Sequence, residues 1–124
     1  MRLRAARTCY DHAAGELGVG LYEMLVDRAW LICDGEECRL TPAGEVALSK
    51  LGVDCSAAQT ARRRFAYPCL DWSERRFHLG GALAASLLKA FVANQWLHRE
   101  VDGRELEVTP AGHRQLQRLG IALA

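Results

Sequence analysis

The chain lacks several features that define common protein classes. None of its 124 residues lies in a hydrophobic run approaching the roughly 20 residues that a membrane-spanning helix needs. The first residues, Met1–Arg4, carry no apolar stretch of the kind found in a secretory signal. Neither sign of charge is in excess, because 16 Lys and Arg face 15 Asp and Glu. Bulk charge is therefore not expected to hold the chain on nucleic acid, and we expect no membrane association.

Other absences concern chemistry and redox state. Without an export signal the cytoplasm is the expected compartment, where thiols stay reduced. The five cysteines are an odd number, which excludes a complete disulfide framework. No Gly-rich loop is followed by a phosphate-binding Lys, and no serine lies in a nucleophile elbow, so we do not expect an enzyme. Hydrophobic residues make up 50% of the chain, which is enough for one ordinary core.

The most informative feature of the sequence is an internal repeat. Trp30-Leu31 recurs as Trp96-Leu97 at an offset of 66, and Thr41-Pro42-Ala43-Gly44 recurs as Thr109-Pro110-Ala111-Gly112 at an offset of 68. The two-residue change falls just before an Asp-Gly pair, where a longer hairpin tolerates it. The order of matches over some fifty residues predicts that one module is present twice.

Each unit is predicted to contain a long helix followed by a β-hairpin. Apolar residues at helical spacing predict helices over about 11–28 and 76–95. Hairpins follow, with the tight-turn signals Asp34-Gly35 and Asp102-Gly103.

A second helix is predicted to open after each hairpin. Thr41 and Thr109 are expected to cap these helices, with a proline at the first helical position. Gly52 and Gly120 fit the left-handed position at which such helices end.

These elements predict an α+β fold that is mainly helical. It would consist of two tandem winged-helix-like repeats (helix, β-hairpin wing, helix) packed about a pseudo-twofold axis. A unit of about 55 residues has little core of its own. Residues 1–124 are therefore expected to form one compact domain, with repeats 9–53 and 69–121 joined by linker 54–68.

Several segments together carry a resemblance to a known family. They are Arg7-Thr8-Cys9-Tyr10-Asp11-His12, Trp30-Leu31, Leu40-Thr41-Pro42-Ala43-Gly44, Pro68-Cys69-Leu70-Asp71-Trp72-Ser73-Glu74-Arg75-Arg76 and His78-Leu79. They resemble the C-terminal half of a subgroup of ArsR-type (arsenic-repressor-like) winged-helix transcriptional regulators. The most specific segment is the one that begins at Pro68.

The resemblance implies an effector-sensing or dimerisation domain of a bacterial transcriptional regulator. In such regulators an N-terminal helix-turn-helix reads the operator. In this chain the segment before Arg7 is too short to hold another small domain of roughly 80–100 residues. The principal DNA-reading element is therefore expected N-terminal to this chain. The implied partners are DNA through the intact regulator, a second copy in a homodimer, and a small effector or metal ion.

One constellation of polar residues has the chemistry of a binding site. Its members are Cys9, Asp11, His12, Cys69, Asp71 and His78, with Trp72 beside them as an aromatic that could stack on a ligand. Thiolate, imidazole and carboxylate together suit zinc or another thiophilic metal. A pseudo-twofold would place the two Cys-x-Asp segments in related positions, where a bound effector could shift the packing of the two units.

A structural interpretation of the same residues stays open and is the more common one. The spacings match no standard zinc pattern. Asp11 and Asp71 lie close to the predicted starts of the long helices, where they would act as N-caps or dipole partners. Cysteine is commonly a small buried hydrophobe, and a tryptophan such as Trp72 before a helix is commonly a packing anchor.

A second cysteine pair flanks the first hairpin turn. Cys33 and Cys38 could lie opposite each other and form a redox switch on oxidation. The second unit carries no thiols at the corresponding places, so the hairpin is expected to fold without a disulfide. We expect a reduced, merely adjacent pair.

Arginines form a local basic concentration in this near-neutral chain. The candidates for an anion or for the DNA backbone are Arg62, Arg63, Arg64, Arg75, Arg76, Arg99 and Arg104. More often such arginines form a solvated face or pair with nearby carboxylates. Two alternatives to the sensor hypothesis remain: winged units that bind DNA directly through these arginines, and a metal- or redox-responsive module independent of transcription.

Overall fold

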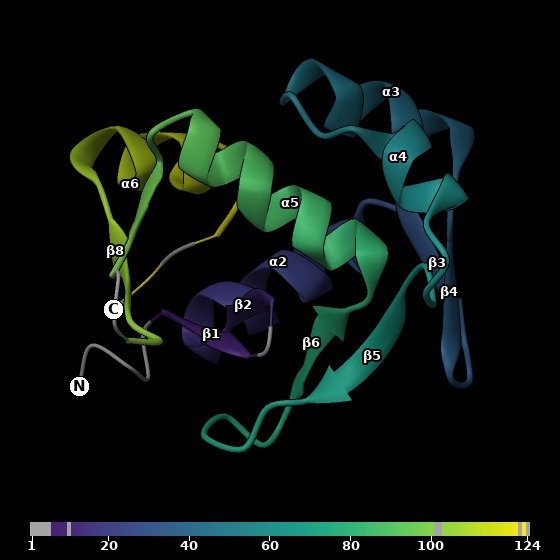
Figure 1. The fold of residues 1–124 in the computed structure, drawn as a ribbon, viewed down its shortest axis with the longest axis horizontal. Helices are drawn as coiled ribbons and strands as arrows, with labels where there is room; N and C mark the ends of the chain where they lie inside the picture. The colour runs from purple at the N-terminus through teal and green to yellow at the C-terminus, as the bar shows by residue number, and fades with distance from the viewer. Residues whose placement is uncertain (1–5, 10, 101–102, 122, 124) are drawn as a thin grey trace.

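The fold was examined in a computed structural model, which describes residues 6–9, 11–100, 103–121 and 123. It is a mixed α+β structure, as predicted (Figure 1). In chain order the elements are β1 (Arg7–Cys9), β2 (His12–Ala14), α2 (Gly15–Asp27), β3 (Leu31–Asp34), β4 (Glu37–Leu40), α3 (Pro42–Lys50), α4 (Cys55–Thr60), β5 (Tyr67–Leu70), β6 (Phe77–Gly80), α5 (Ala82–Ala93), β7 (Leu97–Arg99), β8 (Leu106–Val108) and α6 (Pro110–Arg118).

The two halves of the chain present their elements in the same order. Each half runs hairpin, helix, hairpin, helix, and the short helix α4 lies between the halves. The strands pair as the antiparallel hairpins β1–β2, β3–β4, β5–β6 and β7–β8. Figure 1 shows β3–β4 with α3 at one end of the molecule and β7–β8 with α6 at the other, while α2 and α5 lie between them.

The first hairpin of each half was not predicted. Helix α2 begins at Gly15 instead of near 11, and α5 begins at Ala82 instead of near 76. The preceding residues form β1–β2 and β5–β6. Their strands have three or four residues, too few to show the alternation by which a strand is read from sequence. Leu79, which fits the apolar stripe of the predicted helix, is buried in β6 instead.

Each opening hairpin packs against the long helix of the other half. Strand β6 contacts α2, and β2 contacts α5. The core between the two helices is closed by buried side chains, which include Leu17, Leu21, Leu25, Leu83, Leu87 and Phe91. The halves therefore interlock, because neither long helix is covered by its own half alone.

The predicted starts and ends of the second helices are confirmed. The hydroxyl of Thr41 accepts a hydrogen bond from the Gly44 amide at 3.0 Å, and that of Thr109 accepts one from the Gly112 amide at 2.9 Å. A proline occupies the start of both helices. Gly52 and Gly120 adopt φ of 91° and 87° just past the helix ends, in the left-handed region.

The first wing turns one residue later than predicted. Asp34 still pairs with Glu37 across the hairpin, so the turn residues are Gly35 and Glu36, and Gly35 has φ of 66°. The predicted turn at Asp102-Gly103 lies partly outside the described residues, because Asp102 is not among them. Among the described helices, none is long and apolar enough to cross a membrane.

We expect Gly44→Ala to destabilise the fold, even though alanine favours a helix by about 1 kcal/mol relative to glycine. A Cβ at Gly44 would collide with the carbonyl oxygen of Trp30, which is backbone and has little freedom to move. The expected loss is about 1–3 kcal/mol in the free energy of unfolding, measured in urea. The matched control is Gly103→Ala, whose Cβ would meet nothing closer than 3.8 Å. Equal stability of the two variants would contradict the close approach at Gly44.

Candidate metal centre

Two thiols and two imidazoles converge between the opening hairpins. Cys9 and His12 are direct cross-strand partners in β1–β2, and Cys69 and His78 are direct cross-strand partners in β5–β6. Side chains of such partners project from the same face of a hairpin. Because β2 lies against β6, one donor atom from each of the four residues lies within 4.8 Å of the others. Four members of the constellation predicted from the sequence therefore meet.

The two imidazoles form the buried centre of this cluster. His12 and His78 are 2% and 0% exposed, and their Nε2 atoms lie 3.1 Å apart. Burial lowers the pKa of His12, and the neighbouring His78 lowers it further. Burial also lowers the pKa of His78, although Asp71 acts in the opposite direction. The neutral imidazole, which is the form that ligates metals, is therefore favoured at both positions.

The two cysteines lie at the more open side of the cluster. Both are half-buried and free. Burial raises the pKa of the Cys69 thiol, and Cys9 and Asp71 raise it further because they disfavour a second negative charge nearby. Without a cation the Cys69 thiol is therefore expected to stay protonated at neutral pH.

A carboxylate faces the outer nitrogen of each imidazole. The Nδ1–H of His78 donates to Oδ2 of Asp71 at 2.9 Å. Oδ1 of Asp11 lies 3.6 Å from Nδ1 of His12, a nitrogen that is buried without a hydrogen-bond partner. Both rings thus turn Nε2 inward and Nδ1 toward a carboxylate. This is the arrangement in which outer carboxylates orient metal-binding histidines.

Asp71 does more than orient His78. Its Oδ2 also accepts the amide N–H of Gly15 at 2.6 Å, and its Oδ1 accepts hydrogen bonds from the side chains of Arg7 at 3.0 Å and Ser73 at 2.8 Å. The amides of Ser73 and Glu74 donate to the same oxygen. Burial alone would raise the pKa of Asp71, but these hydrogen bonds outweigh it and hold the pKa well below the ordinary range.

The predicted N-cap roles of the two aspartates are wrong in different ways. Asp71 receives the first amide of α2, which belongs to the other half, because β5–β6 packs on that helix. Asp11 lies between β1 and β2 and forms an ion pair with Arg63. Burial raises the pKa of Asp11, and the bond from Arg63 more than compensates and lowers it. Both errors follow from the hairpins that the sequence did not reveal.

Sequence reasoning missed Arg7 as a member of the site. Its side chain is fully buried, and besides Asp71 it donates to Ser73 Oγ at 2.9 Å. The guanidinium carbon lies 4.2 Å from the centre of the Trp72 ring. Trp72 is 62% exposed, so it covers Arg7 instead of anchoring the core. Assigning residues 7–9 to a strand would have placed Arg7 and Cys9 on one face, but three residues are too few for that assignment.

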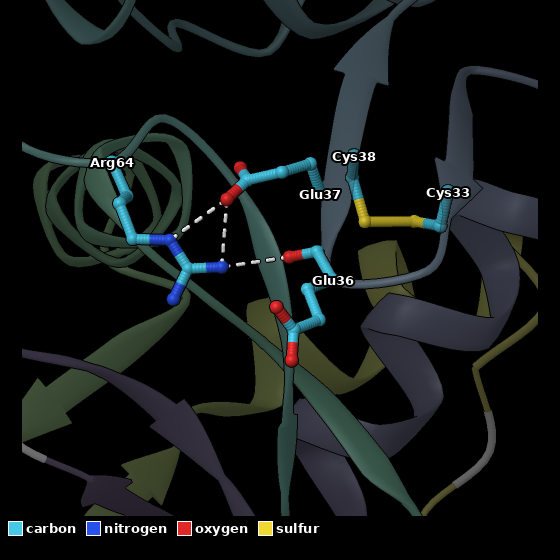
Figure 2. Close-up of a disulfide and its surroundings, with 5 residues drawn as sticks. All are labelled: Cys33, Glu36, Glu37, Cys38 and Arg64. Atoms are coloured by element: carbon cyan, nitrogen blue, oxygen red, sulfur yellow. Dashed lines mark hydrogen bonds and ion pairs between the residues drawn. A yellow bond between two sulfur atoms is a disulfide. The ribbon is translucent and has the colours of Figure 1, made fainter.

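The prediction of a reduced Cys33 and Cys38 pair is wrong, because the two form a disulfide (Figure 2). They are direct partners in the β3–β4 register, with Cα atoms 3.9 Å apart. Figure 2 also shows Arg64 beside this hairpin. Its side chain donates to Glu37 Oε1 at 2.9 Å and to the Glu36 carbonyl at 2.7 Å. Cys55 is buried and free in α4.

The arginine candidates do not form one free basic surface. Arg63 pairs with Asp11, Arg64 with Glu37, and Arg76 with Glu23. The remaining candidates are exposed in different parts of the chain: Arg62, Arg75, Arg99 and Arg104. The arrangement therefore favours the interpretation in which the run at 62–64 holds the linker to carboxylates.

Comparison with known proteins adds one relative. The chain is 39% identical over 110 residues to an uncharacterized HTH-type transcriptional regulator, YdfF, of Bacillus subtilis (strain 168). The match covers 89% of this chain and 49% of the relative, so the chain spans about half the length of that protein. No family model matches the chain. No solved structure matches it either.

The two equivalent aspartates should differ sharply in their effect on stability. Asp71→Asn removes the carboxylate charge that pairs with the buried guanidinium of Arg7, and breaking a buried pair costs about 3–5 kcal/mol. Asp11→Asn removes a pair whose side chains are more than a third exposed, so a loss below about 1 kcal/mol is expected. Urea unfolding of the two variants measures the difference. Similar losses would show that the Asp71 network does not hold the hairpins together.

Thiol counting tests the disulfide. In denaturant without reductant three cysteines should react with a thiol reagent, and all five should react after reduction. Replacing both Cys33 and Cys38 by serine should keep the fold, because β7–β8 forms without thiols, and should cost about 2 kcal/mol for so short a loop. Five reactive thiols in protein purified without reductant would contradict the disulfide.

Proposed function

We propose that this chain is the effector-sensing and dimerising part of an ArsR-type transcriptional regulator. The observation that carries the proposal is the cluster of Cys9, His12, Cys69 and His78, built from both halves of a chain that resembles half of an HTH-type regulator. In the proposal, the DNA-reading helix-turn-helix precedes this chain in the regulator. The regulator acts in the cytoplasm as a homodimer and is not an enzyme.

Matching hydrogen bonds support a duplicated winged-helix-like unit with a pseudo-twofold axis. The Trp30 amide donates to the carbonyl oxygen of Leu25, and in the second half the Trp96 amide donates to the carbonyl oxygen of Phe91. The wings also cross over in a matched way, because the Cys38 amide donates to Ala66 in the other half and the Leu106 amide donates to Ala6. Such an exchange is what two copies related by a twofold would form.

The interlocked packing suggests how an effector would act on DNA. Strand β6 lies on α2 and β2 lies on α5, so a ligand that binds both hairpins also sets the relative position of the two long helices. In a dimeric regulator, a change of this kind would alter the spacing of the two DNA-reading helices. Effector and operator would then be coupled through one packing equilibrium.

The chain alone should not recognise an operator. Fluorescence anisotropy of its own promoter DNA should show no tighter binding than unrelated DNA at physiological salt, because the formal net charge is only +1 and three candidate arginines are paired. Fused in place of the matching half of the Bacillus subtilis relative, the chain should restore a dimer that binds that regulator's promoter. Specific binding by the chain alone, weakened by replacing Arg99 and Arg104 with alanine, would favour a DNA-reading role instead.

A further inference from the structure

We propose that Cys9, His12, Cys69 and His78 bind one divalent ion of the zinc class in a tetrahedral site, with Asp71 and Asp11 orienting the two imidazoles. The inference that this ion is the effector rests on the proposed function. The inference that the chain binds the ion rests on the geometry of this chain alone, and it can be tested without DNA.

The spacing of the donor atoms suits such an ion. With metal–nitrogen bonds of about 2.0–2.1 Å and metal–sulfur bonds of about 2.3 Å, tetrahedral ligand atoms lie roughly 3.3–3.8 Å apart. The two Nε2 atoms are 3.1 Å apart, and the four donors lie within 4.8 Å of one another. Side-chain adjustments of a few tenths of an ångström up to about 1 Å would therefore complete the site. Two sulfurs with two imidazoles suit zinc and softer ions, not calcium or magnesium.

The positions of the imidazole nitrogens suit a cation at the centre of the cluster. Two neutral imidazoles carry one N–H each, but their nitrogens make three contacts that would each need a proton to become a hydrogen bond. Nδ1 of His78 faces Asp71, Nδ1 of His12 faces Asp11, and the two Nε2 atoms face each other at 3.1 Å. Nδ1 of His12 is buried, has no hydrogen-bond partner and lies 3.6 Å from Oδ1 of Asp11. A metal ion between the Nε2 atoms accepts both lone pairs and lets both protons face carboxylates.

The ligand pattern also explains why spacing rules do not detect the site. Each hairpin supplies one cysteine and one histidine as a cross-strand pair, with two residues between them in the first hairpin and eight in the second. A set of four exists only when the halves pack together. Structural roles for buried thiols and caps account for each residue separately, but they do not require four donors to converge.

The test is cobalt titration of the whole 124-residue chain, with reductant present to protect the thiols. We expect one Co²⁺ per chain, the intense visible absorption of a tetrahedral site with thiolate ligands, and displacement of cobalt by Zn²⁺. Cys9→Ser and Cys69→Ser should each weaken metal binding at least about 100-fold, and Asp11→Asn by roughly 10–100-fold, as is typical of an outer partner.

The matched control is Cys55→Ser, because Cys55 is also a free cysteine but lies in α4, outside the cluster. A double Cys33→Ser and Cys38→Ser variant excludes binding by the reduced wing pair. Both controls should keep the stoichiometry and the affinity of the unchanged chain. Far-UV circular dichroism shows which variants are folded, and His12→Gln provides a second ligand variant that should lose binding if a cysteine variant does not fold.

The outcomes separate the two proposals. No stoichiometric uptake by the unchanged chain, or an equal loss in Cys55→Ser and Cys9→Ser, overturns the metal site and leaves the regulator proposal standing. Stoichiometric uptake that depends on Cys9 and Cys69 establishes the site. If the metal-loaded fusion protein then binds promoter DNA no differently from the metal-free form, the ion is not the effector.

Discussion

The buried carboxylate of Asp71 is the contact on which the middle of this molecule depends. It accepts hydrogen bonds from strand β1 through Arg7, from the start of α2 through Gly15, and from β6 through His78. These groups belong to both halves of the chain. A buried charge with this many donors is stable only when all of them are in place, because an unpaired charge in the interior is costly. Asp71 therefore couples the packing of the hairpins to the position of the first long helix.

This coupling gives the Cys and His cluster its importance. The same β6 strand carries His78 into the Asp71 network and into contact with His12. Any ligand between the two imidazoles would act on the contact between β2 and β6, the strands that pack on α5 and α2. The disulfide of the first wing lies in a separate hairpin, where Arg64 binds the turn.

The sequence predicted the outer parts of the fold better than its centre. Thr41, Thr109, Gly52 and Gly120 act locally, through caps and φ values, and the structure has each of them in its predicted role. The opening hairpins escaped prediction because strands of three or four residues show no periodicity of their own. Because these hairpins were not predicted, the roles of the aspartates were also predicted wrongly. Asp71 caps the helix of the opposite half, not that of its own. Cys33 and Cys38 form a disulfide because the strand register places them opposite each other. The cellular compartment expected from the sequence says nothing about that register.

By itself the sequence determined the mixed class of the fold, the helix boundaries set by local caps, and a set of residues with metal-binding chemistry. Those features depend on side-chain type and on contacts between near neighbours along the chain. Only the tertiary structure decided which four of the candidate residues meet, and that Arg7 belongs with them. Cys9 and Cys69 are separated by sixty positions, and they meet because the apolar faces of two long helices are buried by each other's hairpins.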